Sequence, residues 1–456
     1  MDRPVPVAIH DRLPKSVDAV WQSLLSHGHT VLVGGSVRDW LLGKAPHDWD
    51  LATALTPDIV LAIGQQAGYR VVPTGLNFGT VTWLTEAGPV EITTFRRDGR
   101  YVDGRHPQMV TFGDTLEEDL ARRDFTMNAM AIEWDGRLVD PFGGARDLQA
   151  GQIVAVGRAD HRFAEDPLRM MRAVRFTGLD HHGHPLALAP SVMAAIQRLK
   201  PLLLNVSAER QRDELMKLLD EPHFGSALRS LDASGLLGIM WPEWVATQGF
   251  DQQTPYHPWP LHEHLLVTAG AGPSPLLRLT GLLHDIGKPS CFWVDEHGTG
   301  HFYDHERLGA IMARRLLERL AFDRAAIDRV SILIAQHMFP WESAGAKTMR
   351  RMIREHGDEI IEQLLELRRM DVAGQGRVWD PDHAVRNTVT SLLQERPPAL
   401  RHLAINGHAV MHATGVQPGP AVGRYLEALH DWVDEDPARN TPDQLLQRLH
   451  EIAGMP

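Results

Sequence analysis

The stretch VLVGGSVRDWLLGKAPHDWDLAT, residues 31–53, decides the fold of the N-terminal part of the chain. Its apolar start reads as a strand that runs into Gly34-Gly35, and a helix is expected to begin near Ser36. Glycines let the backbone approach a phosphate closely, and the helix N-terminus offers free N–H groups to an anion. Arg38, one turn into the helix, can reach the same anion. The stretch therefore predicts a phosphate-binding turn between a strand and a helix.

Two aspartates follow where the next predicted strand, WDLAT at 49–53, begins. Because residues i and i+2 of a strand point to the same side, Asp48 and Asp50 are expected to face one spot. Carboxylates suit Mg²⁺, and paired ions can activate a hydroxyl group and stabilise a leaving pyrophosphate. A glycine turn or a D-x-D pair is common alone. Together they predict a two-metal phosphoryl-transfer site with Asp48 and Asp50 as catalytic Mg²⁺ ligands.

Short β-rich runs surround this motif, so the first 150 residues are expected to form an α/β head. The predicted strands cover 31–35, 49–53, 80–84 and 90–95, and a helix is predicted over 57–68. Beyond Gly151 the β signal fades, and the pattern is helical from Phe163 nearly to the end, with breaks at 181–190, 247–260 and 294–304. We expect an α+β protein in four parts: a head at 1–150, a helical neck at 151–225, a helical body at 226–375 and a helical tail at 376–456.

The composition narrows the class of protein. A single cysteine, Cys291, rules out a disulfide framework and suits a reducing cytoplasm. The N-terminal segment has no apolar signal region, and no apolar run approaches the roughly 20 residues of a membrane helix. We therefore expect a cytoplasmic protein with no membrane partner. The net charge of −12 argues against nonspecific coating of nucleic acid, although Arg158–Lys217 carries a surplus of three positive charges.

The glycine turn and the aspartate pair resemble the head of the class II tRNA nucleotidyltransferase and bacterial poly(A) polymerase family. The family pattern is G-G-x-V-R-D followed about ten residues later by D-x-D, and residues 34–50 carry all of it. EITTFRRDGRYVDGRHPQMVTF at 91–112 looks like the family's flexible loop, and DPFGGARDL at 140–148 like a structural turn out of the head. Glu91 is either a third catalytic acid at the metals or a strand-edge charge.

A second head motif, LARRDFTMNAMA at 120–131, also matches the family. The resemblance implies that Arg123 contacts the incoming triphosphate and that Asp124 and Asn128 shape the nucleotide pocket. Without the resemblance, the residues are also consistent with Arg123 as the cap of a helix.

The segment FAEDPLRMMRAVRF at 163–176 resembles the family's E-D-x-x-R motif. Asp166-Pro167 is in addition a good helix start, with Asp as N-cap and Pro at the first helical position. Three arginines follow along one side of the helix, each offset about 60° from the last: Arg169, Arg172 and Arg175. In a buried neck this band can line a nucleotide pocket.

The bases themselves explain why few side chains are needed. Adenine and cytosine present an amino donor beside a ring-nitrogen acceptor, whereas uracil and guanine present a carbonyl beside an N–H. An acceptor from Asp166 and a donor from Arg169 match the first edge and clash with the second. The resemblance implies that these two residues read the base of incoming ATP or CTP, while Arg172 and Arg175 assist at the sugar and phosphate. SAERQRDELMKLL at 207–219 matches the family's next helix and is expected to be scaffold.

Between residues 262 and 371 the histidines follow a recognisable motif. Adjacent His-Asp in LLHDIGK, with His before it and Asp after it, resembles the HD metal-dependent phosphohydrolase superfamily. The expected metal ligands are His264, His284, Asp285, His305, His337 and Asp371. His and carboxylate ligands suit a transition metal such as Mn, Ni, Fe or Zn and leave positions open for water. The resemblance implies hydrolysis of phosphate esters or cyclic phosphates, with an inactive scaffold as the alternative.

The C-terminal segment 405–433 looks like the tail of the same family. A helix is predicted to open at Ala421, and its N-terminus either holds a phosphate of tRNA or is a plain helix start.

Three functions remain open. The first is a tRNA nucleotidyltransferase that adds C and/or A residues to the tRNA 3′ end from CTP and ATP. Within this family an enzyme that adds only CC is expected to lack part of the flexible loop. Residues 98–105 of that loop are all present, so we rank CC addition alone last. The second is a poly(A) polymerase, for which a basic R-R-F-R-L-x-H-V type segment is expected instead of EITTFRRDGRYVDG. The third is a phosphohydrolase with an inactive RNA-binding head, which the intact glycine turn and aspartate pair disfavour.

Overall fold

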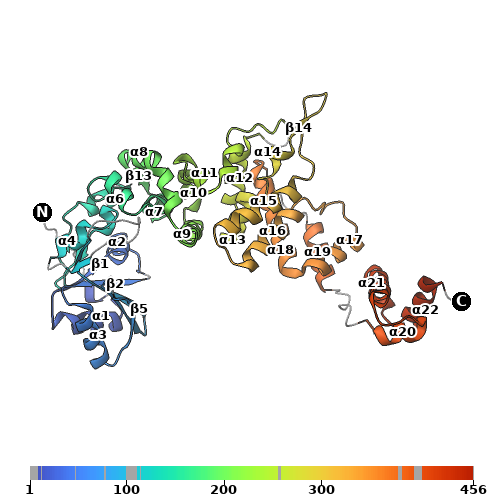
Figure 1. The fold of residues 1–456 in the computed structure, drawn as a ribbon, viewed down its shortest axis with the longest axis horizontal. Helices are drawn as coiled ribbons and strands as arrows, with labels where there is room; N and C mark the ends of the chain where they lie inside the picture. The colour runs from blue at the N-terminus through green and yellow to red at the C-terminus, as the bar shows by residue number, and fades with distance from the viewer. Residues whose placement is uncertain are drawn as a thin grey trace. The chain divides into compact units, whose positions relative to one another are not determined.

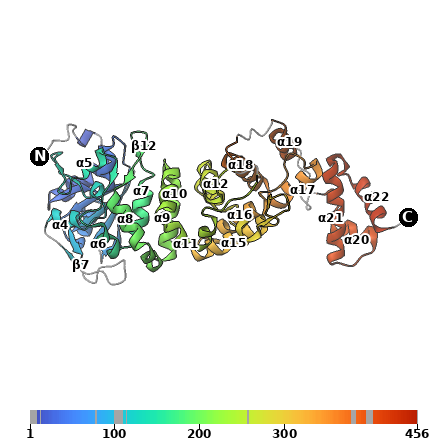
Figure 2. The ribbon, with the colours of Figure 1, turned by 90° about the horizontal axis from the view of Figure 1, so that it is seen from above.

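A computed structural model describes the chain except residues 1–8, 12, 47, 77–78, 99–109, 113–114, 255–257, 378–382, 395–402 and 455–456. Two compact units result (Figure 1, Figure 2). They comprise Met1–Ala246 with Leu316–Phe322, and Thr247–Arg315 with Asp323–Pro456. The α+β class is confirmed, and the finer division into four parts stays a prediction. No helix among the described residues is both long and apolar enough to cross a membrane.

The first unit is built on a seven-stranded sheet of order β3-β4-β5-β2-β1-β8-β9. Its strands are β1 (Thr30–Val33), β2 (Trp49–Thr53), β3 (Arg70–Gly75), β4 (Thr80–Thr85), β5 (Gly88–Thr94), β8 (Ala131–Ile132) and β9 (Leu138–Val139). The central pair β2 and β5 is parallel, whereas β1 runs antiparallel to both of its neighbours. All four predicted strands are present. The strand β3 was not predicted, because its side chains are partly or fully exposed and give little apolar signal.

Helices α1 (Lys15–Leu25) and α3 (Pro57–Gln66) pack against this sheet. Helix α3 confirms the helix predicted between the second and third strands. Each residue of β1 is buried, as expected for a strand covered on both faces. A short ribbon, β6 (Arg96–Asp98) with β7 (Val110–Phe112), flanks the segment 99–109, so half of the flexible loop predicted at 91–112 lies outside the described residues.

The rest of the first unit is mainly helical. Its helices are α2 (Gly35–Leu41), α4 (Leu116–Ala121), α5 (Gly144–Gln149), α6 (Ala159–Glu165), α7 (Leu168–Phe176), α8 (Pro190–Leu199), α9 (Ala208–Asp220), α10 (Phe224–Ala233) and α11 (Leu236–Met240). The prediction of an all-helical neck is wrong in one detail. Two-residue strands pair within it, β10 (Gln152–Ile153) with β13 (Ala187–Leu188) and β11 (Asp180–His181) with β12 (His184–Pro185). Such short pairs leave no periodic pattern in the sequence.

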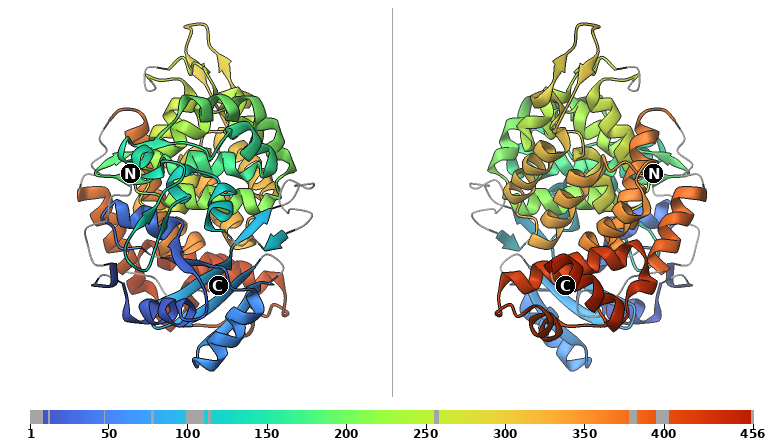
Figure 3. Two further views of the ribbon diagram at one scale, coloured as in Figure 1. Left: turned by 90° about the vertical axis from the view of Figure 1, so that its left-hand side faces the viewer. Right: turned by 90° about the vertical axis from the view of Figure 1, so that its right-hand side faces the viewer.

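Where the structure describes it, the second unit is helical apart from one hairpin. Its helices are α12 (Leu261–Gly270), α13 (Pro275–Leu283), α14 (Lys288–Cys291), α15 (His305–Arg319), α16 (Arg324–Gln336), α17 (Ala346–His356), α18 (Asp358–Gly374), α19 (His383–Gln394), α20 (Gly407–Thr414), α21 (Pro420–Glu435) and α22 (Pro442–Ala453). The hairpin of β14 (Trp293–Val294) and β15 (Gly300–His301) begins one residue before the predicted break at 294–304 and extends away from these helices (Figure 3). Helix α21 begins one residue before the predicted start at Ala421.

Candidate active site of the head and a candidate metal centre

The turn from β1 into α2 brings backbone, acid and arginine close together. Gly34 has φ +74°, a conformation that favours glycine, and precedes the helix that begins at Gly35. A Cβ on Gly34 would lie 3.1 Å from Nη1 of Arg123 and 3.1 Å from Oδ2 of Asp50. Any larger residue would therefore crowd both side chains. The glycine is needed for close approach as well as for the turn.

The three candidate catalytic acids come from two neighbouring central strands. Asp48 directly precedes β2, Asp50 lies on it, and Glu91 on β5 is the register partner of Asp50. Because β5 lies between β4 and β2, the alternative that Glu91 is a strand-edge charge is wrong. Burial, with further contributions from Glu91 and Asp48, raises the pKa of Asp50 to about 6, although Arg123 and Arg38 oppose the rise. A carboxylate whose pKa is raised by burial and by two neighbouring acids belongs to a donor set that suits a divalent cation.

Two arginines, Arg38 and Arg123, lie close to these acids, and each is held by other groups. Arg38 donates from Nε to Asp39 at 2.9 Å and from Nη1 to the side chain of Asn128 at 3.1 Å. Arg123 donates to Oδ2 of Asp119 at 3.1 Å and to the Asn128 backbone carbonyl at 3.3 Å. Asp119 is fully buried and was not among the site residues predicted from the sequence. Its spacing of three and four residues before two arginines was the available signal.

The arginines of helix α7 point toward acids of other elements. Arg172 donates from Nε to Asp124 at 2.8 Å. Burial raises the pKa of Asp124, but Arg172 and Arg169 outweigh it and hold that pKa at about 2. Arg175 donates to Glu214 and to Glu221, each at 2.5 Å. The helix α9 therefore supplies one of these acids, Glu214, and Glu221 follows directly after its end.

Asp166 has two partners. Its Oδ1 accepts from the Leu168 backbone N–H at 3.1 Å, so Asp166 caps the start of α7, as predicted. The helix itself begins at Leu168, one residue after the predicted first position, Pro167. Arg210 donates to its two carboxylate oxygens at 3.2 and 2.7 Å. Arg169 instead donates to Glu165 at 2.7 Å. The sequence did not single out Arg210, because its pairing depends on how α9 packs against α7.

All of the head and neck residues named from the sequence line one cavity of about 600 Å³. They are Gly34, Gly35, Arg38, Asp48, Asp50, Glu91, Arg123, Asp124, Asn128, Asp166, Arg169, Arg172 and Arg175. The cavity thus joins an acidic end, where a divalent cation fits, to a basic wall suited to a triphosphate.

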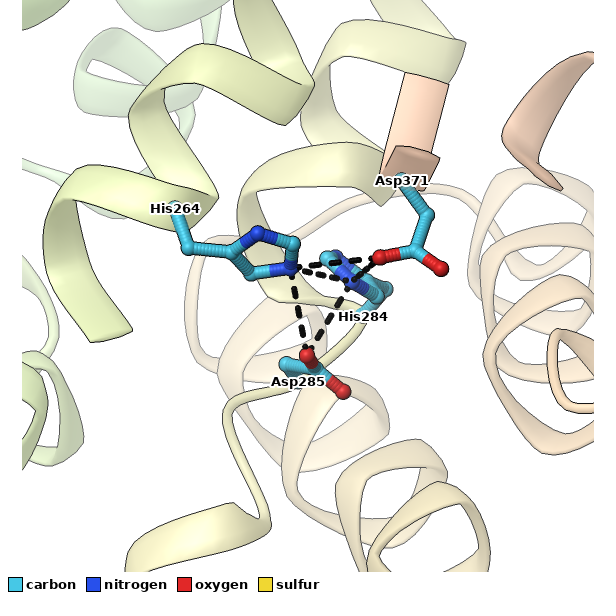
Figure 4. Close-up of side chains that lie close together, drawn as sticks. All are labelled: His264, His284, Asp285 and Asp371. Carbon is cyan, nitrogen blue, oxygen red and sulfur yellow. Dashed lines mark hydrogen bonds and ion pairs between the residues drawn. The ribbon is translucent and has the colours of Figure 1, made fainter. Parts of the chain in front are cut away.

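The six residues of the predicted HD-type centre also meet, in the second unit. The first group, His264, His284, Asp285 and Asp371, brings the Nε2 atoms of its histidines to 3.2 Å (Figure 4). The second group, Asp285, His305 and His337, places its histidine Nε2 atoms 3.3 Å apart. All ligand atoms within each group lie within 4.8 Å of one another. Asp285 belongs to both groups, an arrangement that suits two neighbouring cations.

Three of these histidines have a fixed orientation. The Nδ1 atoms of His284, His305 and His337 lie 2.7 to 2.8 Å from backbone carbonyl oxygens of their own segments. Nδ1 must donate in these bonds, so Nε2 presents its lone pair toward the carboxylates when the ring is neutral. This is the arrangement that metal-binding histidines adopt. The residues therefore fit a transition metal.

A raised histidine pKa and one lysine offset the negative charge of the first group. Burial lowers the pKa of His284, but Asp285 and Asp371 outweigh it and raise that pKa to about 10. Burial opposes a fall in the pKa of Asp285, yet His284 and Lys288 hold it well below its usual range. Lys288 lies 2.6 Å from Asp285. A divalent cation would release such protons on binding.

Comparison with known proteins bears on both sites. Three family models match: the poly A polymerase head domain at residues 30–154, the probable RNA and SrmB-binding site of polymerase A at 186–247, and the HD domain at 265–373. A CCA-adding enzyme of Latilactobacillus sakei is 33% identical over 91% of this chain and 92% of its own length. An A-adding tRNA nucleotidyltransferase of Deinococcus radiodurans is 34% identical over 87% of this chain and 90% of its own. The chain belongs to the tRNA nucleotidyltransferase family.

Other members of the tRNA nucleotidyltransferase family match more closely but over a shorter span. The CCA-adding enzyme of Geobacillus thermodenitrificans is 46% identical over 216 residues, so the chain spans about half of that relative, 52% of its length. A crystal structure of the Bacillus stearothermophilus CCA-adding enzyme with CTP superimposes with a TM-score of 0.71 at 30% identity. The superposition covers 96% of this chain and 97% of that one. The family predicted from the sequence motifs is confirmed.

Proposed function

We propose that this protein adds C and/or A residues to the 3′ end of tRNA, using CTP and ATP as donors. The observation that carries the proposal is the single cavity in which Asp48, Asp50 and Glu91 face the arginines of α2 and α7. A nucleoside triphosphate needs both halves of such a cavity, since cations and arginines must stabilise its phosphates while another wall selects its base.

The acidic end is the proposed reaction centre. Asp48 and Asp50 would hold Mg²⁺, and Glu91 is the proposed third acid because its charge reaches Asp50. When bound, paired cations supply activation of the 3′-hydroxyl and stabilisation of the leaving pyrophosphate. Arg38 and Arg123 would bind the triphosphate, and the hydrogen bonds to Asn128 and neighbouring acids keep both guanidinium groups in place before substrate arrives.

Base selection is proposed for the start of α7. Arg210 holds the Asp166 carboxylate in one orientation, and Asp166 can accept a hydrogen bond from the amino group of adenine or cytosine. Arg169 would donate to the neighbouring ring nitrogen after turning from Glu165, with Arg172 and Arg175 at the sugar and phosphates. Asp124 and Asn128 would shape the floor of the pocket.

The set of nucleotides added follows from an extension assay. The relatives include a CCA-adding enzyme and an A-adding tRNA nucleotidyltransferase, so both are candidates. Purified protein is incubated with tRNA that ends before, within and after CC, with each NTP alone. Extension of the shortest tRNA by CTP and of the CC-ended tRNA by ATP supports CCA addition, whereas extension by ATP alone supports A addition. Long A tracts on unrelated RNA would instead support a poly(A) polymerase.

A second function is proposed for the His–Asp centre, because its oriented imidazoles and shared carboxylate fit a pair of transition-metal cations. We propose that it hydrolyses phosphate esters such as a 2′,3′-cyclic phosphate on a damaged tRNA end. The oxygen of water bonds to phosphorus, one ester P–O bond breaks, and the released oxygen takes a proton to become a hydroxyl. Metal analysis with hydrolysis assays under Mn²⁺, Ni²⁺ or Co²⁺ tests this; a protein with no metal and no hydrolysis has only a scaffold here.

A further inference from the structure

The β14–β15 hairpin carries three aromatic rings on one face. Trp293 and His301 are register partners, and Tyr303 lies two residues beyond His301, which is the same-side spacing of an extended chain. The ring centroids of Trp293 and His301 are 4.6 Å apart with 23° between their planes. Those of His301 and Tyr303 are 5.6 Å apart with 13° between their planes. His301 thus stacks with both Trp293 and Tyr303, and we call this set of three stacked rings the ring platform.

Packing does not account for the ring platform. The alternate residues, Phe292 and Phe302, stack on each other and hold the hairpin, and Lys288 lies 5.2 Å from the Phe302 ring centroid. On the platform side, Trp293 is 47% exposed and Tyr303 is 69% exposed. Large aromatic side chains that gather in solvent commonly mark a binding surface.

The ring platform stands beside the His–Asp centre. His301 and Tyr303 line a cavity of about 620 Å³ together with the proposed metal ligands Asp285, His305, His337 and Asp371. Tyr303 is separated from His305 by Asp304, which has the uncommon φ of +63°. A sharp turn therefore connects the platform directly to a proposed metal ligand.

The remaining lining of this cavity fits a nucleotide. Met338 is 52% exposed and adds an apolar wall, while Arg368 and Arg377 add positive charge. Arg368 lies 3.2 Å from Asp371, which holds it at the edge of the His–Asp centre. Exposed aromatic rings such as Trp293 and Tyr303 bind a nucleobase by stacking, and arginines bind phosphate or sugar oxygens.

We propose that Trp293, His301 and Tyr303 bind the nucleobase of a nucleotide whose phosphate ester lies at the His–Asp centre. The inference rests on the proposed hydrolase function and names its substrate class: a nucleotide, either free or at the end of an RNA, in place of a small phosphate ester. Asp295 supports the platform, since its carboxylate accepts from Nε2 of His301 at 2.7 Å.

The test compares two substrates that differ in the base. The full chain loaded with Mn²⁺ is assayed on adenosine 2′,3′-cyclic phosphate and on glycerol 1,2-cyclic phosphate, which has no base. We expect kcat/KM to favour the adenosine ester. The double substitution Trp293→Ala with Tyr303→Ala is expected to lower this preference roughly tenfold, because stacking on one base contributes about that much or more to binding.

Two variants control for the fold of the hairpin. Trp293→Phe with Tyr303→Phe keeps the rings and should keep the preference. Val294→Ala alters an exposed neighbour outside the platform and should also keep it. An RNA oligonucleotide that ends in a 2′,3′-cyclic phosphate separates the two sources. A larger ring effect on the oligonucleotide indicates an RNA end, and an equal effect indicates a free nucleotide.

The outcomes distinguish the two proposals. Equal base preference in the wild type and the double alanine variant overturns the ring platform and leaves the hydrolase intact. If the wild type hydrolyses neither ester, the hydrolase proposal fails. Binding of adenosine 2′-monophosphate with Mn²⁺, measured by equilibrium dialysis, then decides: ring-dependent binding supports the platform and ring-independent binding refutes it.

Discussion

The head cavity and the His–Asp centre both gather acids around a place for cations, but they do so in different ways. In the head, Asp48 and Glu91 are exposed, and arginines supply the nearby positive charge. In the His–Asp centre, His284 and Asp285 are buried, and histidines and one lysine balance the carboxylates. An open site with oxygen donors allows a cation to arrive with the substrate, as Mg²⁺ does with a nucleotide. A buried site with oriented imidazoles is built to retain its metal.

The largest expected effect separates the two sites at the head. Asp48→Ala or Asp50→Ala should lower nucleotide addition about a thousandfold or more while tRNA binding survives, because each removes a charge that stabilises the phosphoryl-transfer centre. Labelled ATP or CTP incorporation measures the rate. Asp58→Ala, at an exposed position of α3, is the matched control and should leave the rate unchanged. Near-normal addition by Asp48→Ala or Asp50→Ala contradicts the two-metal assignment.

The converse substitution acts on the other site. His284→Ala or Asp285→Ala should remove the bound transition metal and lower phosphate-ester hydrolysis by at least about a hundredfold, since loss of a ligand should exceed the effect of losing a supporting residue. Nucleotide addition should remain largely intact. Elemental analysis of the purified variants, beside the two assays, measures both results. His297→Ala serves as control because that histidine side chain is 79% exposed. Loss of addition in step with loss of metal would show that the sites depend on each other.

The third prediction concerns discrimination among the four bases, which is proposed for the head cavity alone. Asp166→Ala or Arg169→Ala should reduce discrimination against UTP and GTP roughly tenfold to a hundredfold, the range for one good hydrogen-bonded base contact, and should slow addition of C and A. Single-turnover rates with each NTP measure this. Asp160→Ala removes a surface acid of α6 and is the control. Full discrimination by Asp166→Ala would reduce Asp166 to a helix cap.

The two regions also differ in how far sequence reasoning reaches. The strand, glycine turn and aspartate pair within residues 31–53 are local, so their pattern predicts both the fold and the acidic end of the cavity. The ligands of the His–Asp centre spread over more than a hundred residues and were recognised through family resemblance. Supporting contacts such as those of Asp166 with Arg210 and of Arg175 with Glu214 were not predicted. They depend on how the helices pack, and a charged residue on a helix does not reveal its partner through the sequence pattern.

The smallest expected effect concerns one of those supporting contacts. Arg210→Ala removes a guanidinium group that donates to both carboxylate oxygens of Asp166. The side chains of Arg210 and Asp166 are 22% and 16% exposed, so solvent screens part of the interaction. We expect the rate of addition and the discrimination between bases to fall by at most about fivefold, because Leu168 still orients the Asp166 carboxylate. Arg210→Lys keeps the charge without the fork and should give an intermediate result. Arg198→Ala, which breaks a more exposed ion pair with Asp160, should have no effect on base choice. If Arg210→Ala matched Asp166→Ala in its loss of discrimination, Arg210 would itself contact the base, and the reading site would extend from α7 onto α9.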